Sequence, residues 1–488
     1  MVNVIFRVLL ISNLLLGLII AQAFEGYTLY SPTGSGNING VSYLIDNELN
    51  IINTWTHSRG AASMPYLLQD SSIIYPHTVA NPTMSTGGVG GGIAKITWSG
   101  DIVWDYTISN NTYQHHHDIM PLPNGNILAI VWERKTASEA YAKGRTSLNN
   151  SLNEMWSTAI LEIQPFGSNG GNVVWEWHLW DHLVQNNDPG LPNYGVISEH
   201  PELMDVNYGT VGGGGGPGGA NADWMHVNAI DYNLELDQIV FSSRHQNEIY
   251  IIDHSTTTAE AASHEGGNSG KGGDFLFRWG NPQVYDRGTN NNQQLQGQHG
   301  VNWIPESYPG GGNLMIFNNQ YQNNNSAVFE IETPINANDT YLLEDDMAYG
   351  PNNPVWLHSV GEFSSVQSGA FRLPNGNTLI SVADDALILE VTNNGTAVWN
   401  YEHPTNNTMI ARAQKYSVEY LSGNNTGFPE YILGDINFDE EINIIDLLYL
   451  SDMVIGSYSS YPTANVHIGS DEINISDILS LLALIIQL

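Results

Sequence analysis

The chain has 488 residues, of which 41% are hydrophobic, so it can bury a large core and is too apolar for wholesale disorder. Fifty Asp and Glu residues against 14 Lys and Arg residues give a net charge of −36, which repels phosphate backbones and excludes general nucleic-acid binding. The absence of cysteine excludes disulfides, thiolate metal sites, iron–sulfur clusters and cysteine nucleophiles.

Residues 1–23 have the pattern of a secretory signal peptide. One basic residue, Arg7, precedes an apolar stretch at 8–20, and Ala21-Gln22-Ala23 forms a small-x-small cleavage site. An N-terminal membrane anchor is the alternative. No other run reaches the roughly 18 apolar residues of a membrane span, so we expect none in the mature chain. The protein is therefore predicted to be secreted, whether extracellular, periplasmic or held at the cell surface.

A repeat of short strands organises residues 24–427. One kind of segment is a turn followed by an apolar strand that reaches a tryptophan, at Trp104, Trp175 and Trp399. The other kind is a pair of apolar strands joined by a tight turn. In two copies that turn is Asn-Gly, at 124–125 and 375–376, which is the strongest short signal for a hairpin.

Weaker copies of the paired strands bring the repeat count to about six over roughly 400 residues, at 65–75, 227–241, 301–317 and 413–421. This spacing predicts an all-β protein with a six-bladed β-propeller. A blade cannot bury both faces alone, so blades stack in a ring and the tryptophans are expected to pack between them. An array of β-sandwiches is the alternative architecture.

Histidines recur just before the first apolar strand of three repeats. They occur in a triplet at 115–117, at His226 and at His299. His116 and His226 share one repeat register, and His299 is one step off. If these strands are the innermost of their blades, the three imidazoles converge on one mouth of the central channel.

Arg244 lies at the far end of the strand that starts after His226. An arginine in an apolar strand is unusual in a chain with so few basic residues. A structural ion pair would explain Arg244 alone, and a hydrogen-bonded core position would explain any one histidine. The combination favours a functional site. A rival interpretation makes His115 and His117 a metal chelate, because alternate strand residues share a face.

Residues 428–488 change to helix-period apolar spacing and are predicted to form a separate α-helical module. Oxygen-bearing side chains occupy positions 1, 3, 5, 9 and 12 of a calcium-binding loop, namely Asp435, Asn437, Asp439, Asn443 and Asp446. A second loop–helix pattern at 473–488 makes the module resemble a type I dockerin (EF-hand type).

The dockerin-like pattern departs from its type at two points. Glu440 stands where the loop usually has glycine, and the second copy lacks the first three ligands. We therefore expect one Ca²⁺ ion in the C-terminal module. The resemblance implies a cohesin-like or cell-surface partner, and a plain helical hairpin packed on the propeller is the alternative.

The residues around the histidines resemble the bacterial arylsulfotransferase family over about residues 40–422. The runs that carry the resemblance lie at 116–118 leading into 122–126, and at 223–228, 238–245, 250–257 and 277–282. Members of that family are six-bladed propellers that move a sulfuryl group from one phenol to another. They do so through a sulfated histidine and without a free sulfated nucleotide.

The resemblance also implies roles for individual residues. His299 corresponds to the histidine that carries the sulfuryl group, and His226 and Arg244 correspond to two further essential residues. The remaining histidine falls in the triplet, where register favours His116. His117 and Asn228 are expected to contact substrate.

The chemistry of sulfuryl transfer suits these residue types. A sulfate ester is a monoanion whose peripheral oxygens gain charge during transfer, so the site needs a cation such as Arg244. A neutral imidazole can act as nucleophile, and a second can protonate the leaving phenolate and later deprotonate the acceptor phenol. The predicted reaction is ping-pong and requires no cofactor.

Two other classes of function remain open at the level of sequence. One is a propeller that binds extracellular ligands without catalysis. The other is a structural surface or matrix protein assembled through its C-terminal module. The presence of all four groups, His116, His226, Arg244 and His299, favours an aryl-sulfate sulfotransferase.

Overall fold

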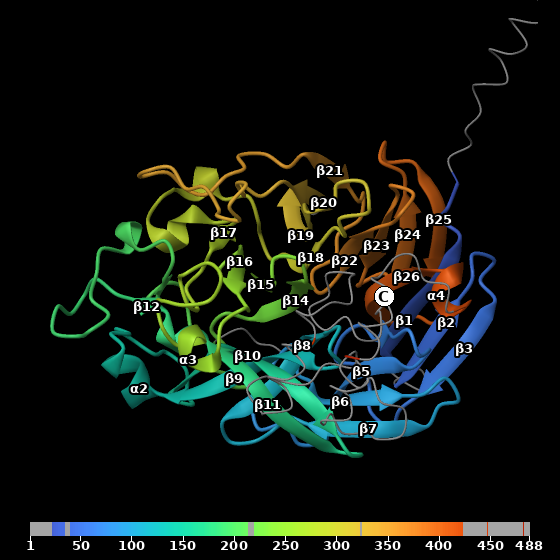
Figure 1. Cartoon of the computed structure of the whole chain (residues 1–488), viewed down its shortest axis with the longest axis horizontal. Coiled ribbons are helices and arrows are strands. Elements are labelled where there is room, and N and C mark those ends of the chain that lie inside the picture. Colours follow the sequence, from blue (N-terminus) through green and yellow to red (C-terminus); the bar gives the residue numbers. More distant parts are fainter. Residues whose placement is uncertain are drawn as a thin grey trace, which may run out of the picture.

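The computed structural model describes residues 22–34, 40–212, 219–322 and 325–422, together with Leu447 and Leu482. Six four-stranded antiparallel sheets follow one another around a ring (Figure 1). The predicted six-bladed β-propeller is therefore confirmed for this part of the chain. The predicted signal peptide, apart from its last two residues, and the dockerin-like module with its calcium ligands lie outside the described residues.

The sheets are numbered here as blades 1–6 in chain order, and each is given from its innermost strand outward. Blade 1 contains β26 (Thr408–Ser417), β1 (Gly26–Gly34), β2 (Val41–Ile45) and β3 (Ile51–Thr56). Blade 2 contains β4 (Tyr66–Leu67), β5 (Ile73–Thr78), β6 (Gly91–Ile96) and β7 (Ile102–Thr107). Blade 3 contains β8 (Tyr113–Pro121), β9 (Ile127–Thr136), β10 (Glu154–Phe166) and β11 (Gly170–His178).

The other three blades follow the same order. Blade 4 contains β14 (Val227–Asn233), β15 (Gln238–Ser243), β16 (Glu248–Asp253) and β17 (Phe277–Trp279). Blade 5 contains β18 (His299–Trp303), β19 (Leu314–Gln322), β20 (Asn325–Ile331) and β21 (Trp356–Ser359). Blade 6 contains β22 (Gly369–Arg372), β23 (Thr378–Val382), β24 (Leu387–Val391) and β25 (Ala397–Glu402).

The remaining elements are short and lie outside the blades. The α-helices are α2 (Ala137–Ala142), α3 (Thr258–Ala261) and α4 (Val418–Ser422). The 3₁₀ helices are η1 (Leu179–Asp181), η2 (Ile197–Glu199), η3 (Pro282–Tyr285) and η4 (Asn290–Asn292), and β12 (Leu183–Val184) pairs with β13 (Met204–Asp205). Among the described residues, no helix has the length and apolar character needed to cross a membrane.

Blade 1 closes the ring. Its innermost strand, β26, comes from the far end of the propeller and pairs antiparallel with β1, from Gly26 opposite Ser417 to Gly34 opposite Thr408. The first and last strands of the propeller are thus joined in one sheet by backbone hydrogen bonds, which closes the ring.

The two Asn-Gly turns form the hairpins that the sequence predicts. In the first, the amide of Gly125 donates to the carbonyl of Leu122 at 3.0 Å, and the φ of Gly125 is 84°. In the second, Gly376 donates to Leu373 at 2.9 Å with a φ of 86°. Glycine fits these positions because it adopts positive φ without a steric penalty.

The outermost strand of every blade carries a tryptophan whose indole N–H donates to the next blade around the ring. These residues, named here the tryptophan ring, are Trp55, Trp104, Trp175, Trp279, Trp356 and Trp399. The donor–acceptor distances run from 2.7 to 3.2 Å. Five acceptors are backbone carbonyls, and the other is Thr256 Oγ1. The predicted packing between blades is thus confirmed for Trp104, Trp175 and Trp399.

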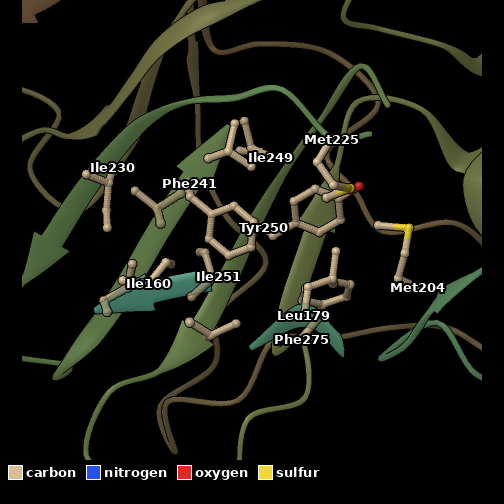
Figure 2. Packing of buried hydrophobic residues seen from close by; sticks show 14 of the residues in the cluster. Ile160, Leu179, Met204, Met225, Ile230, Phe241, Ile249, Tyr250, Ile251 and Phe275 are labelled. Carbon is tan, nitrogen blue, oxygen red and sulfur yellow. The ribbon is translucent and has the colours of Figure 1, made fainter. Parts of the chain in front are cut away.

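Apolar side chains fill the space between neighbouring blades. In the largest cluster, Ile160 of blade 3 packs with Phe241, Tyr250 and Ile251 of blade 4 (Figure 2). Alternate residues of β15 and β16 face opposite sides, yet both strands are buried throughout, because each is covered by a blade on either face.

Candidate active site

The three strands that carry the predicted histidines are the innermost strands of consecutive blades. β14 lies between β8 and β18, so the starts of these strands come together around the channel. Pairing with the second strand is irregular in all three, with register shifts between His115 and Ile119, between Val227 and Ala229, and between His299 and Asn302.

A left-handed residue marks the same point in all three strands. The φ angle is 53° at His117, 50° at His226 and 65° at Gly300. The structure therefore aligns His117, and not His116, with His226, one residue away from the register predicted from sequence. The physical reason is the bulge, which interrupts the alternation of side chains on which a strand alignment depends.

A small cavity adjoins these strands. Its lining includes His117, Asn228 and His299, but not His116. His116 is fully buried and stacks on Trp132, with ring centroids 4.1 Å apart and 10° between the ring planes. Of the four histidines expected at the site, His117 and His299 line this cavity together with Asn228. His116, His226 and Arg244 are not among its lining residues.

The hydrogen bonds of His299 fix its tautomer. Its Nδ1 lies 3.0 Å from the carbonyl oxygen of Gly297 and 2.8 Å from Oδ1 of Asn319. The amide nitrogen of Asn319 donates to two backbone carbonyls, so its oxygen is the atom that faces His299. Both partners of Nδ1 are acceptors, so Nδ1 carries the proton and Nε2 carries a lone pair. Burial lowers the pKa of His299 to about 3, which keeps the ring neutral at pH 7.

His226 is paired with a buried carboxylate. Its Nδ1 lies 2.5 Å from Oδ2 of Asp223, and its backbone amide donates to Oδ1 of the same residue at 3.2 Å. Trp132 Nε1 also donates to that Oδ1, at 3.0 Å. Burial alone would raise the pKa of Asp223, but the hydrogen-bonded His226 more than offsets this and holds it below its usual value. The pair presents the Nε2 of His226 as a group that can give or take a proton.

His117 connects the buried histidine to the cavity. Its Nδ1 lies 2.8 Å from Nδ1 of His116, and its ring meets that of His226 edge-on at 4.7 Å. Burial lowers the pKa of His117 well below its usual value. Its ring lies directly against Gly88, where a Cβ would come within 2.0 Å of the ring, so only glycine fits there.

Two guanidinium groups lie at the site and differ in their partners. Arg244 follows β15, and its backbone amide donates to the carbonyl of His226 at 3.2 Å. Besides burial, its positive charge helps to lower the pKa of His299. Within the described part of the chain, the guanidinium of Arg244 has no hydrogen bond or ion pair. Arg412, which lines the cavity, is by contrast ion-paired with the buried Asp118.

Sequence reasoning missed three contributors to the site. Asp223 stands three residues before His226, and that spacing was a usable signal for a side-chain pair. Asn319 and Arg412 left no comparable signal, because Asn319 lies 20 residues from His299 and Arg412 belongs to the ring-closing strand β26. Only the closed ring brings Arg412 to the cavity.

No protein with a curated description matches the chain. Several solved structures resemble the chain, and each of the three that follow is too distant to support an argument about its fold or its function. A protein of unknown function from Bacteroides caccae is 12% identical, with 80% of this chain and 98% of that chain covered and a TM-score of 0.41. The periplasmic gluconolactonase PpgL of Pseudomonas aeruginosa is 11% identical (80% and 99% covered, TM-score 0.42), and the Cps50 (Swd1) beta-propeller domain of Myceliophteria thermophila is 10% identical (79% and 88% covered, TM-score 0.38).

One protein family also matches the chain. Residues 69–420, which include every residue of the cavity described above except Ser63, match the arylsulfotransferase (ASST) family. This span covers well over half of the 488 residues. The chain belongs to the arylsulfotransferase family.

Proposed function

We propose that this protein is an aryl-sulfate sulfotransferase that moves a sulfuryl group from a phenolic sulfate ester to a second phenol. The proposal is carried by His299, whose Nδ1 proton is held by two oxygen acceptors while the ring lines the cavity. A neutral imidazole fixed in this tautomer has its nucleophilic lone pair on Nε2.

In the first half-reaction, Nε2 of His299 attacks the sulfur atom and the bond from sulfur to the aryl oxygen breaks. The departing phenolate takes a proton from Nε2 of the His226 imidazolium. The sulfated His299 ring carries a positive charge beside its anionic sulfuryl group, and the acceptors Gly297 O and Asn319 Oδ1 stabilise the Nδ1–H of that ring.

In the second half-reaction, the acceptor phenol gives its proton to His226, now neutral. The phenolate oxygen attacks sulfur and the bond between sulfur and Nε2 of His299 breaks, which restores the starting enzyme. The Asp223 carboxylate holds His226 in the tautomer that this cycle needs and stabilises its cationic form.

Arg244 is proposed to bind the sulfate oxygens. A guanidinium without a protein partner can spend its donors on an anion, whereas the donors of Arg412 are engaged by Asp118. In an acidic protein with only 14 Lys and Arg residues, such a local cation is needed to attract an anionic substrate.

His117 and Asn228, which line the same cavity as His299, would contact the substrate. Donation from His116 Nδ1 to His117 Nδ1 would leave the proton of His117 on Nε2, available to a sulfate oxygen. Asn228 lines the cavity, and its buried Oδ1 has no hydrogen-bond partner among the described residues. That oxygen can accept from the hydroxyl of the incoming phenol. His116, buried on Trp132, acts through His117 in this scheme.

The test is release of nitrophenol from p-nitrophenyl sulfate in the presence of a phenol acceptor. We expect turnover by the wild type and by His200→Ala, a control at a partly exposed histidine paired with a single glutamate, and none by His299→Asn. Intact-mass analysis after acid-free quenching should show one added sulfuryl group on His299. A folded wild type that neither turns over nor gains this mass would favour a ligand-binding or structural propeller instead.

We further propose that the protein is secreted and that residues 428–488 form a dockerin-like module that binds one Ca²⁺ ion and a cohesin-like or cell-surface partner. Sequence patterns support both proposals: the signal-peptide pattern at 1–23, and the five oxygen-bearing residues between Asp435 and Asp446. Calorimetric titration with Ca²⁺ of the wild type and of Asp435→Asn tests the second proposal, since only the wild type should bind.

A further inference from the structure

A group of metal-ligating side chains lies outside the candidate active site, where the insertion that follows blade 3 meets the insertion in blade 4. His182 follows η1, and His264 and Asp274 lie in the loop between α3 and β17. One ligand atom from each of the three residues lies within 4.8 Å of the other two. Figure 1 shows α3, at the start of this loop, close to β10 and β11 of blade 3.

One carboxylate oxygen is shared by two imidazole nitrogens. Oδ1 of Asp274 lies 2.7 Å from Nδ1 of His182 and 2.8 Å from Nδ1 of His264. The two rings are nearly perpendicular, at 88°, with centroids 5.8 Å apart. The two rings therefore approach the same carboxylate oxygen from different directions.

The proton on His182 is already assigned to its other nitrogen. Nε2 of His182 lies 2.8 Å from the carbonyl oxygen of Ala261, which can only accept, so Nε2 carries a proton. In a neutral ring, Nδ1 then presents a lone pair to the carboxylate oxygen of Asp274. Two lone pairs at 2.7 Å repel each other unless a cation, either a metal ion or a second proton, lies between them. An imidazole that binds a metal through one nitrogen usually donates its other N–H to a backbone carbonyl or a carboxylate, as His182 does to Ala261.

The ring of His182 is held rigidly in this orientation. It stacks on Trp177 with 4° between the ring planes and centroids 5.7 Å apart. The indole of Trp177 donates to the carbonyl of Gly273 at 2.7 Å, and a Cβ at Gly273 would come within 2.6 Å of His182 Nε2. His182 and Asp274 are buried, while the side chain of His264 is 59% exposed, which leaves an entry path and room for a water ligand.

The other two clusters of this kind among the described residues differ. In the group of His57, His77 and Asp105, Nδ1 of His57 accepts from the amide of Arg59 at 3.1 Å. The proton of His57 is therefore on Nε2, which faces Asp105 as a donor and needs no cation between them. In the group of Asp223, His226 and His245, the first two belong to the candidate active site, and His245 stacks on His226 with ring centroids 4.8 Å apart.

We propose that His182, His264 and Asp274 bind one divalent metal ion of the zinc type, with water completing the coordination. Two imidazoles and one carboxylate suit Zn²⁺, and the arrangement offers too few oxygen ligands for Ca²⁺. The ion ties the insertion of blade 3 to the loop of blade 4 and takes no part in the chemistry at His299, so this proposal stands independently of the proposed function.

The test uses the full chain after removal of metal with a chelator and dialysis. Zn²⁺ is titrated by calorimetry into the wild type, His264→Ala and Asp274→Asn, and tetrahedral binding is followed by the visible absorption of Co²⁺. We expect the wild type to bind one equivalent more than either variant and to rise in Tm with Zn²⁺, a rise that both variants lose. His264→Ala should fold normally because that side chain is largely exposed.

His200→Ala is the matched control, since His200 is a partly exposed histidine with one carboxylate partner and should bind as the wild type does. His245→Ala distinguishes this site from the cluster of Asp223, His226 and His245. It should still bind the equivalent of Zn²⁺ that His264→Ala fails to bind. Equal zinc stoichiometry in the wild type and in His264→Ala, or an equal rise in Tm, would overturn the proposal and assign the cation to a second proton on His182.

Discussion

Replacing Asp223 by asparagine tests the proton chemistry at the site most directly. The two donors to Oδ1, Trp132 Nε1 and the His226 amide, hold an oxygen in place, so the new amide nitrogen has to face Nδ1 of His226. His226 must then accept at Nδ1 and carry its proton on Nε2. In that tautomer Nε2 has no lone pair to take the proton of an acceptor phenol.

The size of the effect follows from what is lost. A hydrogen bond to a charged partner contributes about 1.5–3 kcal/mol, which corresponds to roughly 10–150-fold in rate. The wrong tautomer adds to this, and in serine proteases the same change costs about 10⁴-fold. We therefore expect steady-state transfer to phenol to fall by roughly 10²–10⁴-fold in Asp223→Asn.

Stopped-flow measurement with p-nitrophenyl sulfate separates the two half-reactions. Nitrophenolate is a good leaving group that needs little protonation, so the burst of nitrophenol should persist while its slow phase, set by the acceptor phenol, collapses. Asp237→Asn is the matched control. Asp237 Oδ1 lies 2.7 Å from Nδ1 of His254, and neither residue lines the cavity, so this variant should leave both phases unchanged. A steady-state rate within threefold of wild type in a folded Asp223→Asn would refute the assignment of His226.

Three further outcomes are expected. Asn319→Leu removes one of the two acceptors of the His299 Nδ1 proton and should slow the nitrophenol burst about tenfold; an unchanged burst would exclude Asn319 as a positioning residue. Burial would lower the pKa of His254, but hydrogen bonds to Asp237 and Glu162 raise it to about 9. Protonated His254 should therefore stabilise the fold by about 3 kcal/mol below pH 6.5, and this stabilisation should be lost as the pH rises through 9. Urea denaturation should show a steeper loss of stability between pH 6.5 and 9 in wild type than in His254→Gln, and parallel curves would contradict it. Trp104→Phe leaves the Gly170 carbonyl without its indole donor and should cost about 1–3 kcal/mol of unfolding free energy, whereas Trp98→Phe, at a 38% exposed position, should cost less.

The architecture was within reach of the sequence because its signals are local. The Asn-Gly turns at 124–125 and 375–376 require positive φ at the glycine, and a turn of this kind fixes the hairpin around it. The tryptophans at 104, 175 and 399 follow short turns and so stand out. Trp279 and Trp356 do the same work but follow long insertions, which conceal their place in the repeat.

The site was only partly predictable, because its geometry depends on contacts between distant strands. The position of His299 and His226 at the start of innermost strands followed from the repeat. Which histidine of the triplet at 115–117 reaches the cavity depends on the left-handed backbone conformation of His117. An alternating sequence pattern does not predict such a conformation. Arg412 reaches the cavity through closure of the ring, a long-range event that no local motif encodes.

The tryptophan ring lies on the outermost strands of the blades, and the histidines lie on or beside innermost strands. The six indoles make six separate hydrogen bonds at the outer edge of the propeller, and each bond joins only two neighbouring blades. Weakening one of these contacts leaves the other five in place, so the outer edge of the propeller does not depend on any single tryptophan. Side chains of the innermost strands that face the channel can therefore be exchanged for new chemistry while the indole contacts between blades stay in place.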